Sequence, residues 1–375
     1  MRLLLITPDY PPATGGIQLL CARLAAHSRH CCEVVCIGAP APLGVFLGGR
    51  ARRAERAGVM ATPRLRSQLA SVAMLNATAL ARALALRPDA IVSGHIVASP
   101  AAVAAQRITG APVIQMLHAE ELGRRPALTR FATARAAASI AVSSHTRDLA
   151  ISLGAPAQRL HVIHPGVDLP AAGAPPARQG LRPPTIITVA RLTDRYKGFD
   201  VMLKAMPLIR ARVRDARWLL VGEGPLRAEL SQGAAALGIA DALTFAGAVD
   251  DATRDRLLDE ADVFAMPSRL LPGGEGGEGF GIVYLEAGAH RLPCVAGNVG
   301  GALDAVIDGR TGLLVDPTDH AAIAEAIVTL LTDRELARRL GEAGWRHAQS
   351  HSWQRMAGQI DDLIERLPAG RPHPR

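Results

Sequence analysis

Short apolar runs alternate with longer stretches of helical periodicity along the whole of this 375-residue chain. In the first half, the runs that predict strands are RLLLIT, EVVCIG, AIVSG, PVIQML, SIAVS and LHVIH. Stretches between them, such as GIQLLCARLAAH and SPAAVAAQRI, place apolar residues at helical spacing. Strands that alternate with helices predict a parallel sheet with helices on both faces.

A second series of strands follows the segment PAAGAPPARQGLRPP, whose proline and glycine content favours neither helix nor strand. The runs of this series are TIITVA, RWLLVG, LTFAG, DVFAMP, PCVAG and GLLVD. We therefore predict an α/β protein with two Rossmann-like domains, residues 1–168 and 169–351, and a C-terminal segment, 352–375, that is helical with a disordered tail. The length suits two domains of about 150 to 200 residues each.

Four segments of unusual composition each follow a predicted strand. They are TPDYPPATGGIQ, LHAEE, ARLTDRYKGFD and GGEGGEGFGIVYLEA. In open parallel sheets, ligands bind at the carboxyl ends of the strands. We therefore expect these four segments to line one cleft between the two domains.

Composition narrows the class of protein. A hydrophobic content of 49% with few aromatic residues is typical of a well-buried α/β fold. Five scattered cysteines do not make a disulfide framework, which indicates a reducing compartment. The cluster HSRHCCEVVC could hold a metal, but EVVCIG reads better as a buried strand. With no signal peptide and no run of 18 continuous apolar residues, we expect a soluble or peripheral protein.

The net charge of +8 is concentrated in one segment. Between positions 38 and 88 the single acid, Glu55, stands against the arginines Arg50, Arg52, Arg53, Arg56, Arg64, Arg66, Arg82 and Arg87. Such a segment suits an anionic membrane surface, and we expect the first four of these arginines to contribute to lipid association. A solvated arginine-rich face is the alternative. Nucleic acid is not expected as a partner, because no aromatic residues are interleaved with the arginines.

In the glycine-rich stretch GGEGGEGFGIVYLEA the glycines stop at Gly281, where a helix is predicted to begin. Residues 279–281 would present backbone N–H groups at the positive end of this helix, which favours an anion such as phosphate. Glu286 lies inside the helix, where it can accept from a diol, and Glu278 just before it can accept from other hydroxyls. In the alternative interpretation, one glutamate caps the helix and the other lies on the surface, which would explain the acidic residues but not the glycines. Glu275 reads as loop.

The segment ARLTDRYKGFD supplies cations. The chain has only two lysines, Lys197 and Lys204, among 42 lysines and arginines. Lys197 with Arg191 could neutralise a diphosphate, and Arg195 is a second candidate. Gly15 and Gly16 open the first helix and offer another approach to a phosphate. VGEGP lacks the third glycine of a dinucleotide fingerprint.

These motifs together resemble a known family. GGIQ, HPGVD, ARLTDRYKG, VGEGP, FAGAVDD, MPSR, GEGFGIVYLEA and GRTGLLVDPTD, with seven residues between Glu278 and Glu286, resemble the retaining glycosyltransferases of family 4. That family has the GT-B fold, in which two Rossmann-like domains face a central cleft and the C-terminal helix crosses back to the first domain. The PPATGGIQ and EGFGIVYLEA elements are most similar to those of bacterial mannosyltransferases acting on phosphatidylinositol mannosides.

The resemblance implies a role for each matching residue. Glu286 would bind the ribose and Glu278 the donor sugar, while His118 would lie near the sugar and the acceptor. The implied catalytic residues are His118, Glu278, Arg191 and Lys197. The implied donor contacts are Gly15, Gly16, Arg191, Lys197, Val249, Asp251, Arg254, Glu278, Gly279, Phe280, Gly281, Ile282, Val283 and Glu286. Two departures are that Lys197 follows Arg191 by six residues where five is common, and that LHAEE has fewer histidines than usual.

The implied reaction transfers a sugar from a nucleotide diphosphate to an acceptor hydroxyl, with retention and without a metal. In VDDATR, Asp251 and Arg254 fit the spacing at which such mannosyltransferases contact guanine, which favours GDP-mannose over a UDP-sugar. An aspartate that merely caps the next helix is the alternative. The resemblance leaves a lipid, a glycan or a small molecule open as the acceptor, and we expect a cytoplasmic protein that is peripheral to the inner face of the plasma membrane.

Three rival functions remain to be separated from this one. A nucleotide-sugar epimerase on a similar fold would act without an acceptor. A binding module for anionic surfaces would keep the arginine-rich segment without any transfer. A pyridoxal phosphate-dependent phosphorylase is disfavoured, because it needs a buried Schiff-base lysine and the chain offers only Lys197 and Lys204.

Overall fold

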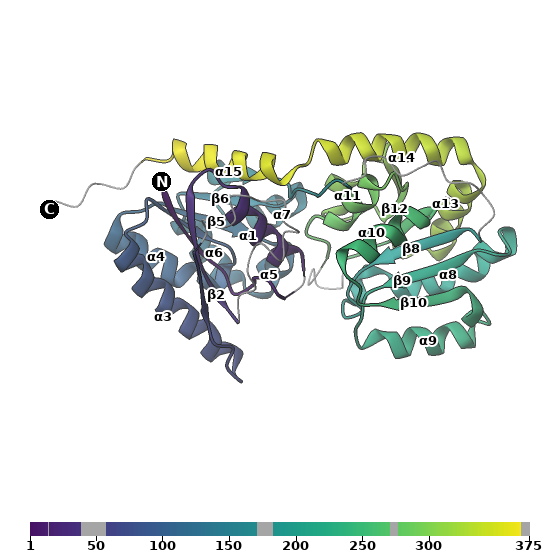
Figure 1. Cartoon of the computed structure of the whole chain (residues 1–375), viewed down its shortest axis with the longest axis horizontal. Coiled ribbons are helices and arrows are strands. Elements are labelled where there is room, and N and C mark those ends of the chain that lie inside the picture. The colour runs from purple at the N-terminus through teal and green to yellow at the C-terminus, as the bar shows by residue number, and fades with distance from the viewer. Residues whose placement is uncertain (14, 39–57, 171–182, 271–276, 369–375) are drawn as a thin grey trace. The chain divides into compact units, whose positions relative to one another are not determined.

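The computed structural model describes residues 1–13, 15–38, 58–170, 183–270 and 277–368. The chain divides into two compact units. Unit 1 contains residues 1–166 together with helix α15 (Trp353–Arg366), and unit 2 contains residues 167–352. In each unit, helices cover a twisted parallel sheet (Figure 1). The predicted α/β class with two Rossmann-like sheets is confirmed.

The sheet of unit 1 has seven parallel strands in the order β3-β2-β1-β4-β5-β6-β7. Their bounds are β1 (Arg2–Ile6), β2 (Cys31–Ile37), β3 (Gly58–Thr62), β4 (Ala90–Ser93), β5 (Val113–Leu117), β6 (Ala138–Ala141) and β7 (Leu160–Val162). Six of these are the strands predicted from the sequence. The exception is β3, because GVMAT is short, lies at the sheet edge and has only one buried residue. The HSRHCC cluster leads into β2 as expected, and the five cysteines are free thiols.

The helices of unit 1 cover both faces of its sheet (Figure 1). Their bounds are α1 (Gly16–His27), α3 (Gln68–Leu86), α4 (Ser99–Thr109), α5 (Ala119–Arg124), α6 (Pro126–Arg135) and α7 (Ser144–Ser152), with 3-10 turns η2 (Ile96–Ala98) and η3 (Ala157–Arg159). On one face, α3 and α4 bury alanine-rich stripes against the apolar side chains of the central strands. Small residues on these helices let them approach the sheet closely.

Helix α15 belongs to unit 1 because it packs on α1 and is tied to the turn that follows α1. The buried Asp361 carboxylate accepts from the Ser28 hydroxyl at 2.7 Å and from the Arg29 backbone N–H at 2.9 Å. The Arg29 guanidinium binds Glu365 at 2.9 Å and also Asp362. Trp353, at the start of α15, is almost completely buried. Unit 1 is thus built from both ends of the chain.

The sheet of unit 2 has six parallel strands in the order β10-β9-β8-β11-β12-β13. Their bounds are β8 (Thr185–Val189), β9 (Arg217–Val221), β10 (Leu243–Gly247), β11 (Val263–Met266), β12 (Cys294–Gly297) and β13 (Gly312–Val315). All six are strands predicted from the sequence. Trp218 on β9 is fully buried, and its ring N–H donates to the Thr188 hydroxyl on β8 at 3.0 Å.

The helices of unit 2 are α8 (Phe199–Arg212), α9 (Leu226–Ala236), α10 (Asp251–Glu260), α11 (Ile282–Ala289), α12 (Ala302–Ala305), α13 (His320–Thr332) and α14 (Arg334–Gln349), with 3-10 turns η4 (Arg195–Lys197) and η5 (Ala240–Ala242). Helices α8 and α13 pack together over the core around Trp218. Helix α11 packs instead against α14. It begins directly after Gly281, where the sequence predicts a helix to start.

Two glycines of the VGEGP segment let the loop after β9 pack tightly on the loop after β8. A Cβ atom at Gly222, where φ is +135°, would lie 2.0 Å from the Ala190 carbonyl oxygen. One at Gly224 would lie 2.4 Å from the Leu192 carbonyl oxygen. Leu192 in turn donates its backbone N–H to Glu223. These glycines therefore support the cationic loop after β8 and are not part of a dinucleotide fingerprint.

We expect Gly222→Ala to destabilise unit 2 by about 1 to 3 kcal/mol or more, because both the backbone conformation and the space at this position exclude a side chain. Gly358→Ala is the matched control. Gly358 lies within α15, and a Cβ there would meet nothing within 4 Å. That change should be neutral or stabilise by up to about 1 kcal/mol. Urea unfolding of both variants tests this; equal stability would contradict the packing argument.

Candidate functional site

The site in unit 2 lies where the strand order of the sheet reverses. Strands β8 and β11 are neighbours, and the chain leaves them toward opposite sides, which is where open α/β sheets bind ligands. The loops after these strands are held together by a hydrogen bond of 2.8 Å from the Arg269 N–H to the Tyr196 carbonyl. A Cβ atom at Gly198, where φ is +79°, would lie only 2.3 Å from the Pro267 carbonyl oxygen. The two loops therefore form one closely packed edge.

Lys197 and Glu278, which are 81 positions apart in sequence, meet at this edge. The Lys197 ammonium donates to the Glu278 carboxylate at 2.5 Å, and each side chain is only 12% exposed. Burial lowers the pKa of Lys197, but the Glu278 carboxylate outweighs it and leaves the pKa above its usual value. The amine is thus a buried cation. The structure brings together the residues that the sequence analysis assigned to diphosphate and sugar.

The two arginines beside Lys197 differ in their partners. The Arg195 guanidinium makes a bidentate pair with Glu229, with distances of 2.8 and 2.7 Å. Arg191 makes a longer contact, 3.3 Å, with Asp194, and the two side chains are similarly exposed, Arg191 by 56% and Arg195 by 60%. The Arg195 guanidinium therefore already makes a bidentate pair with a carboxylate, whereas most N–H donors of Arg191 remain exposed to solvent. Of the two candidates, Arg191 is better placed to take an anion.

The loop before α11 needs its glycines for backbone packing. Gly281 is the N-cap of α11 with φ of +90°, and a Cβ there would lie 2.4 Å from the Tyr284 ring. Gly301, in the loop after β12, donates its N–H to the Glu278 carbonyl at 2.8 Å, and its own Cβ would lie 2.2 Å from the Gly279 oxygen. These close approaches hold Glu278 in place.

Residues 279–283 are arranged around the start of α11. Phe280 is buried, and Ile282 and Val283 form the first turn, where backbone N–H groups have no carbonyl partner within the helix. Glu275 lies outside the described residues. A helix start bordered by glycine and adjacent to a buried lysine favours a bound anion.

Glu286, one turn into α11, faces Arg254 on α10. Its carboxylate lies 3.8 Å from the Arg254 guanidinium, which also binds Asp251 at 2.8 Å and Asp255 at 3.1 Å. Burial raises the pKa of Glu286, and Arg254 opposes this rise without cancelling it. Asp250 caps α10, since its carboxylate accepts from the Thr253 N–H at 2.8 Å.

The capping role of Asp250 leaves Asp251 available for another contact. The Asp251 side chain is 78% exposed and pairs with Arg254. Val249 precedes the cap in the loop after β10. Asp251 and Glu286 therefore both contact Arg254, and Val249 lies two residues before Asp251 in the chain. The contacts of these four residues with a nucleotide remain a prediction.

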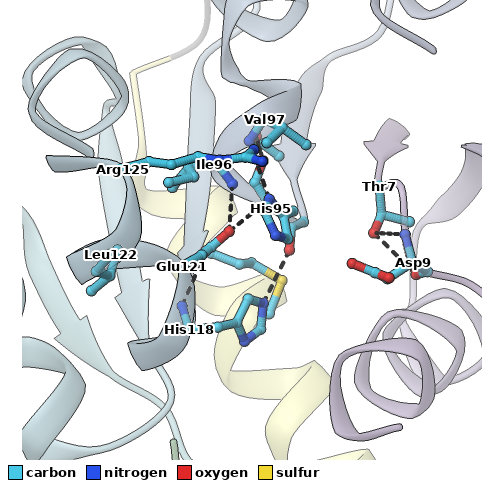
Figure 2. A network of polar contacts seen from close by, with 12 residues as sticks. Thr7, Asp9, His95, Ile96, Val97, His118, Glu121, Leu122 and Arg125 are labelled. Atoms are coloured by element: carbon cyan, nitrogen blue, oxygen red, sulfur yellow. Dashed lines mark hydrogen bonds and ion pairs between the residues drawn. The ribbon is translucent and has the colours of Figure 1, made fainter. Parts of the chain in front are cut away.

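A second polar group lies at the carboxyl edge of the sheet in unit 1, at its own reversal point between β1 and β4. Figure 2 shows His95 after β4, His118 after β5 and Glu121 on α5 gathered together, with Asp9 from the loop after β1 pointing toward them. The buried Glu121 carboxylate contacts the His95 ring at 2.6 Å and accepts from the Ile96 N–H at 3.0 Å.

The charges in this group are set by burial and pairing. Burial lowers the pKa of His95, but Glu121 more than offsets this and raises it. Burial raises the pKa of Glu121, yet His95 and the neighbouring donors bring it below its usual value. Both shifts favour the ionised pair of His95 and Glu121 over its neutral form. The Asp9 carboxylate accepts from Gln18 at 3.0 Å and further favours the protonated His95.

His118 is neutral in this arrangement. Its Nε2 lies 3.0 Å from the Gly94 carbonyl oxygen, which can only accept, so Nε2 carries the proton. Burial lowers the pKa of His118. Its backbone N–H donates to Glu121 at 3.2 Å, which fixes the start of α5. The ring predicted to lie near sugar and acceptor is thus held in one orientation.

The glycines that open α1 are also in unit 1. Gly15 is the N-cap of α1, with φ of +151°, and Gly16 is the first helical residue. A Cβ at Gly15 would lie 2.5 Å from the Gln18 side-chain oxygen. A side chain here would therefore disturb Gln18, which holds Asp9.

Sequence reasoning does not find several members of these groups. His95, Glu121 and Asp255 have no motif of their own, and His290 reads as an ordinary residue at a helix end. Of these residues, only Glu121 could have been found from the sequence, because LHAEE places an acid three residues after the N-cap position of a helix. Among the described residues, no three His, Cys, Asp or Glu side chains are grouped so that they could hold a metal ion.

Comparison with known sequences agrees with this geometry. The profile of glycosyl transferases group 1 matches residues 176–347, and that of glycosyltransferase family 4 matches residues 14–170. A GDP-mannose-dependent alpha-(1-6)-phosphatidylinositol monomannoside mannosyltransferase from Mycobacterium tuberculosis is 35% identical, with 99% of this chain and 100% of the relative covered. A D-inositol 3-phosphate glycosyltransferase from Streptomyces avermitilis is 31% identical, with coverage of 72% and 62%.

Solved structures show the same fold. Anabaena HepE in complex with UDP and glucose has a TM-score of 0.79 and 23% identity, with 98% of this chain and 99% of that chain covered. Sucrose-phosphate synthase from Thermosynechococcus elongatus has a TM-score of 0.80 and 21% identity, with 98% of each chain covered.

Two Rossmann-like units with charged loops at their switch points define an enzyme of the GT-B glycosyltransferase class. With a relative this similar over its full length, the chain belongs to glycosyltransferase family 4. It resembles, within that family, the mannosyltransferases of phosphatidylinositol mannosides.

We expect Lys197→Met and Glu278→Gln each to lower the free energy of unfolding by about 3 to 5 kcal/mol, because either change leaves a buried charge without its partner. The double variant should recover at least half of the summed loss, since neither charge then remains. Lys204→Met, at an exposed position of α8, is the control and should change stability by less than about 0.5 kcal/mol. Strict additivity in urea unfolding would show that the pair is not coupled.

Proposed function

We propose that this glycosyltransferase moves mannose from GDP-mannose to a hydroxyl of an inositol-containing lipid-linked glycan, with retention at the anomeric carbon. The observation that carries the proposal is the similarity, over the whole chain, to mannosyltransferases that are named for this donor and for phosphatidylinositol monomannoside. A second such relative, from Mycolicibacterium smegmatis, is 40% identical over 221 residues. The nucleotide-sugar donor fits the paired charges in unit 2.

Cleavage of the bond between the sugar and the nucleotide diphosphate needs cations beside the diphosphate, because negative charge develops on this leaving group. In the proposal, Lys197 and Arg191 neutralise the charge that grows on the diphosphate, helped by the backbone N–H groups at the start of α11. No divalent cation is required for this step. Glu278 accepts from hydroxyls of the mannose, which means that donor binding exchanges the Lys197 contact of Glu278 for contacts with substrate. Glu286 accepts from the ribose hydroxyls.

The base is the part of the donor that distinguishes GDP from UDP. An exposed carboxylate at Asp251 can accept from two donors of guanine but only from one of uracil. The finding that Asp250 serves as the cap supports this role for Asp251. We therefore propose Asp251 as the guanine contact, with Arg254 between it and Glu286, at 2.8 Å from Asp251 and 3.8 Å from Glu286.

We propose that the acceptor binds to residues of unit 1. His118 keeps a fixed neutral ring, and its Nδ1 can accept from a hydroxyl. The cationic His95 and the nearby Asp9 offer a donor and an acceptor at the same sheet edge (Figure 2). A polyol such as inositol or mannose presents several hydroxyls, which suits a site with both kinds of group.

A lipid acceptor requires that the protein reach a membrane, and helix α3 supplies a suitable surface. It is 19 residues long with a mean hydropathy of 1.6, long and apolar enough by those criteria to cross a membrane. One face packs on the sheet, while Leu69, Met74 and Leu84 on the other are exposed, Leu69 by 82%. Arg64 and Arg66 are exposed just before the helix. Arg50, Arg52, Arg53 and Arg56 lie outside the described residues.

An uncharged exposed face beside arginines suits an anionic bilayer, because the leucines can enter the headgroup region while the guanidinium groups contact lipid phosphates. The only charged residue within α3, Arg82, binds Glu33 at 2.8 Å and so does not repel lipid acyl chains. We propose that unit 1 lies on the cytoplasmic leaflet through this face.

The proposed donor can be tested by measuring sugar transfer and nucleotide binding. Incubation with GDP-mannose and phosphatidylinositol monomannoside should give an α-linked mannosyl product, and addition of EDTA should leave the rate unchanged. GDP and GDP-mannose should raise the thermal unfolding midpoint more than UDP or UDP-glucose at equal concentration. Lys197→Met should lower kcat/KM by about a hundredfold or more, because a cation at the leaving group is lost.

Lys204→Met is the control for that variant and should keep normal turnover. A shift with UDP alone would retain the glycosyltransferase but discard GDP-mannose. Sugar conversion with donor alone would instead indicate an epimerase. Near-normal turnover of Lys197→Met would exclude the diphosphate role of this residue.

The second prediction concerns the membrane. Leu69→Asp with Leu84→Asp should reduce cosedimentation with phosphatidylglycerol-containing vesicles severalfold, since each change places a carboxylate against acyl chains. Arg64→Glu with Arg66→Glu should weaken binding mainly at low salt. Leu208→Asp, at an exposed apolar position of α8 in unit 2, is the matched control. Binding that is equal in all variants would remove α3 from the membrane surface.

A further inference from the structure

Helices α10 and α11 carry a row of side chains of alternating charge that begins at Glu286 and ends at Asp259. On α11, Glu286 and His290 are four residues apart and so lie on the same face. On α10, Asp255 and Asp259 are likewise four residues apart, and the Arg254 side chain contacts that of Asp255. Contacts join them in the order Glu286, Arg254, Asp255, His290 and Asp259.

The first part of this row fixes the Arg254 guanidinium. Its two terminal nitrogens contact Asp251 at 2.8 Å and Asp255 at 3.1 Å, and one of them lies 3.8 Å from Glu286. The remaining nitrogen, Nε, is buried and has no hydrogen-bond partner among the residues that the structure describes. The position of Arg254 beside Glu286 therefore depends on the two aspartates. Of these, Asp251 is the more exposed, which leaves Asp255 as the firmer anchor.

The second part of the row fixes Asp255. His290 is only 4% exposed, and its Nδ1 lies 2.6 Å from Asp259 while its Nε2 lies 3.7 Å from Asp255. Both ring nitrogens face carboxylates, which suits an imidazolium that donates to Asp259 and attracts Asp255 by its charge. His290 is also the C-cap of α11, where the helix dipole favours a cation.

We infer that Asp255 and His290 are positioning residues for donor binding: His290 holds Asp255, Asp255 holds Arg254, and Arg254 keeps Glu286 ionised and in place for the ribose. The inference rests on the proposed function, in which Glu286 accepts from the nucleotide ribose. Neither Asp255 nor His290 touches substrate in this arrangement.

Electrostatics within the row agree with its geometry. Burial raises the pKa of Glu286 and so do three nearby aspartates, whereas Arg254 is the cation that opposes them. Without a fixed Arg254, Glu286 would take up a proton more readily and lose acceptor capacity toward a diol. Burial lowers the pKa of His290, but its two carboxylate partners raise it above the usual value.

The groups that face His290 are few. Asp255 and Asp259 face it from α10. From α14, which packs on α11, Glu342 binds the neighbouring Arg291 at 2.9 Å and is directed to that residue. Because the folded pKa of His290 is raised, its stabilising charge is complete below about pH 6.5 and is lost as the pH rises through the raised value. Donor affinity should decline over the same range.

The test measures GDP binding by titration calorimetry to the full chain between pH 6 and 9. His290→Gln removes the charge and should raise the GDP dissociation constant about tenfold at pH 6.5. Its difference from the wild type should shrink as the pH rises, because the wild type then loses the same charge. Steady-state kinetics should show a higher KM for the donor, with kcat and the acceptor KM changed by less than about twofold.

Two further variants complete the design. Asp255→Asn keeps the shape of the side chain and should reproduce the effect of His290→Gln, and the two changes together should be less than additive. His320→Gln alters an exposed histidine at the start of α13 and should bind GDP like the wild type at every pH. If His290→Gln does not fold, Asp255→Asn and the wild-type pH series carry the test.

The outcomes separate the inference from the proposed function. Equal GDP affinity and equal pH dependence in the wild type, His290→Gln and Asp255→Asn would overturn the positioning role. A wild type that binds no guanosine or uridine nucleotide would instead overturn the donor assignment itself. A donor KM that rises without any change in pH profile would reduce His290 to a packing residue and contradict the inference.

Discussion

A carboxylate that leaves water must be met by a cation, and this requirement organises both functional edges of the protein. In unit 2 the buried Glu278 is paired with Lys197, and the loops after β8 and β11 are packed together as a result. In unit 1 the buried Glu121 is paired with His95, which joins the ends of β4 and β5. Each pair crosses between neighbouring strands at the carboxyl edge of its sheet. The charges that we propose bind substrate thus also hold these loops together.

The same pairing defines what donor binding must accomplish. The Lys197 ammonium has an anionic partner within the chain, so in the proposed mechanism a diphosphate must bind it more strongly than Glu278 does. A dianionic or trianionic leaving group can do so, and the freed Glu278 then meets sugar hydroxyls instead. The proposed exchange would favour an intact nucleotide sugar, because a free nucleotide would contact Lys197 but offer Glu278 no sugar hydroxyls.

How far the sequence predicts the structure depends on the range of the interaction. The twelve predicted strands are confirmed because a buried strand is a local apolar run, whereas the edge strand β3 has too few buried positions to be seen. The spacing of Glu278 and Glu286 is also local and readable. The contact of Glu278 with Lys197 spans 81 positions, and that of His290 with Asp255 depends on how α10 packs on α11. No sequence pattern encodes such contacts, so they appear only in the folded chain.

The division of unit 1 between the two ends of the chain sets an order of events during synthesis. Unit 2 is one continuous segment, so everything it needs has emerged once residue 352 has left the ribosome. Unit 1 begins first but lacks α15, and Ser28 and Arg29 have no Asp361 to bind until the last helix emerges. The unit that is translated first is therefore completed after unit 2, and the surface of α1 that α15 covers stays uncovered until α15 has been synthesised.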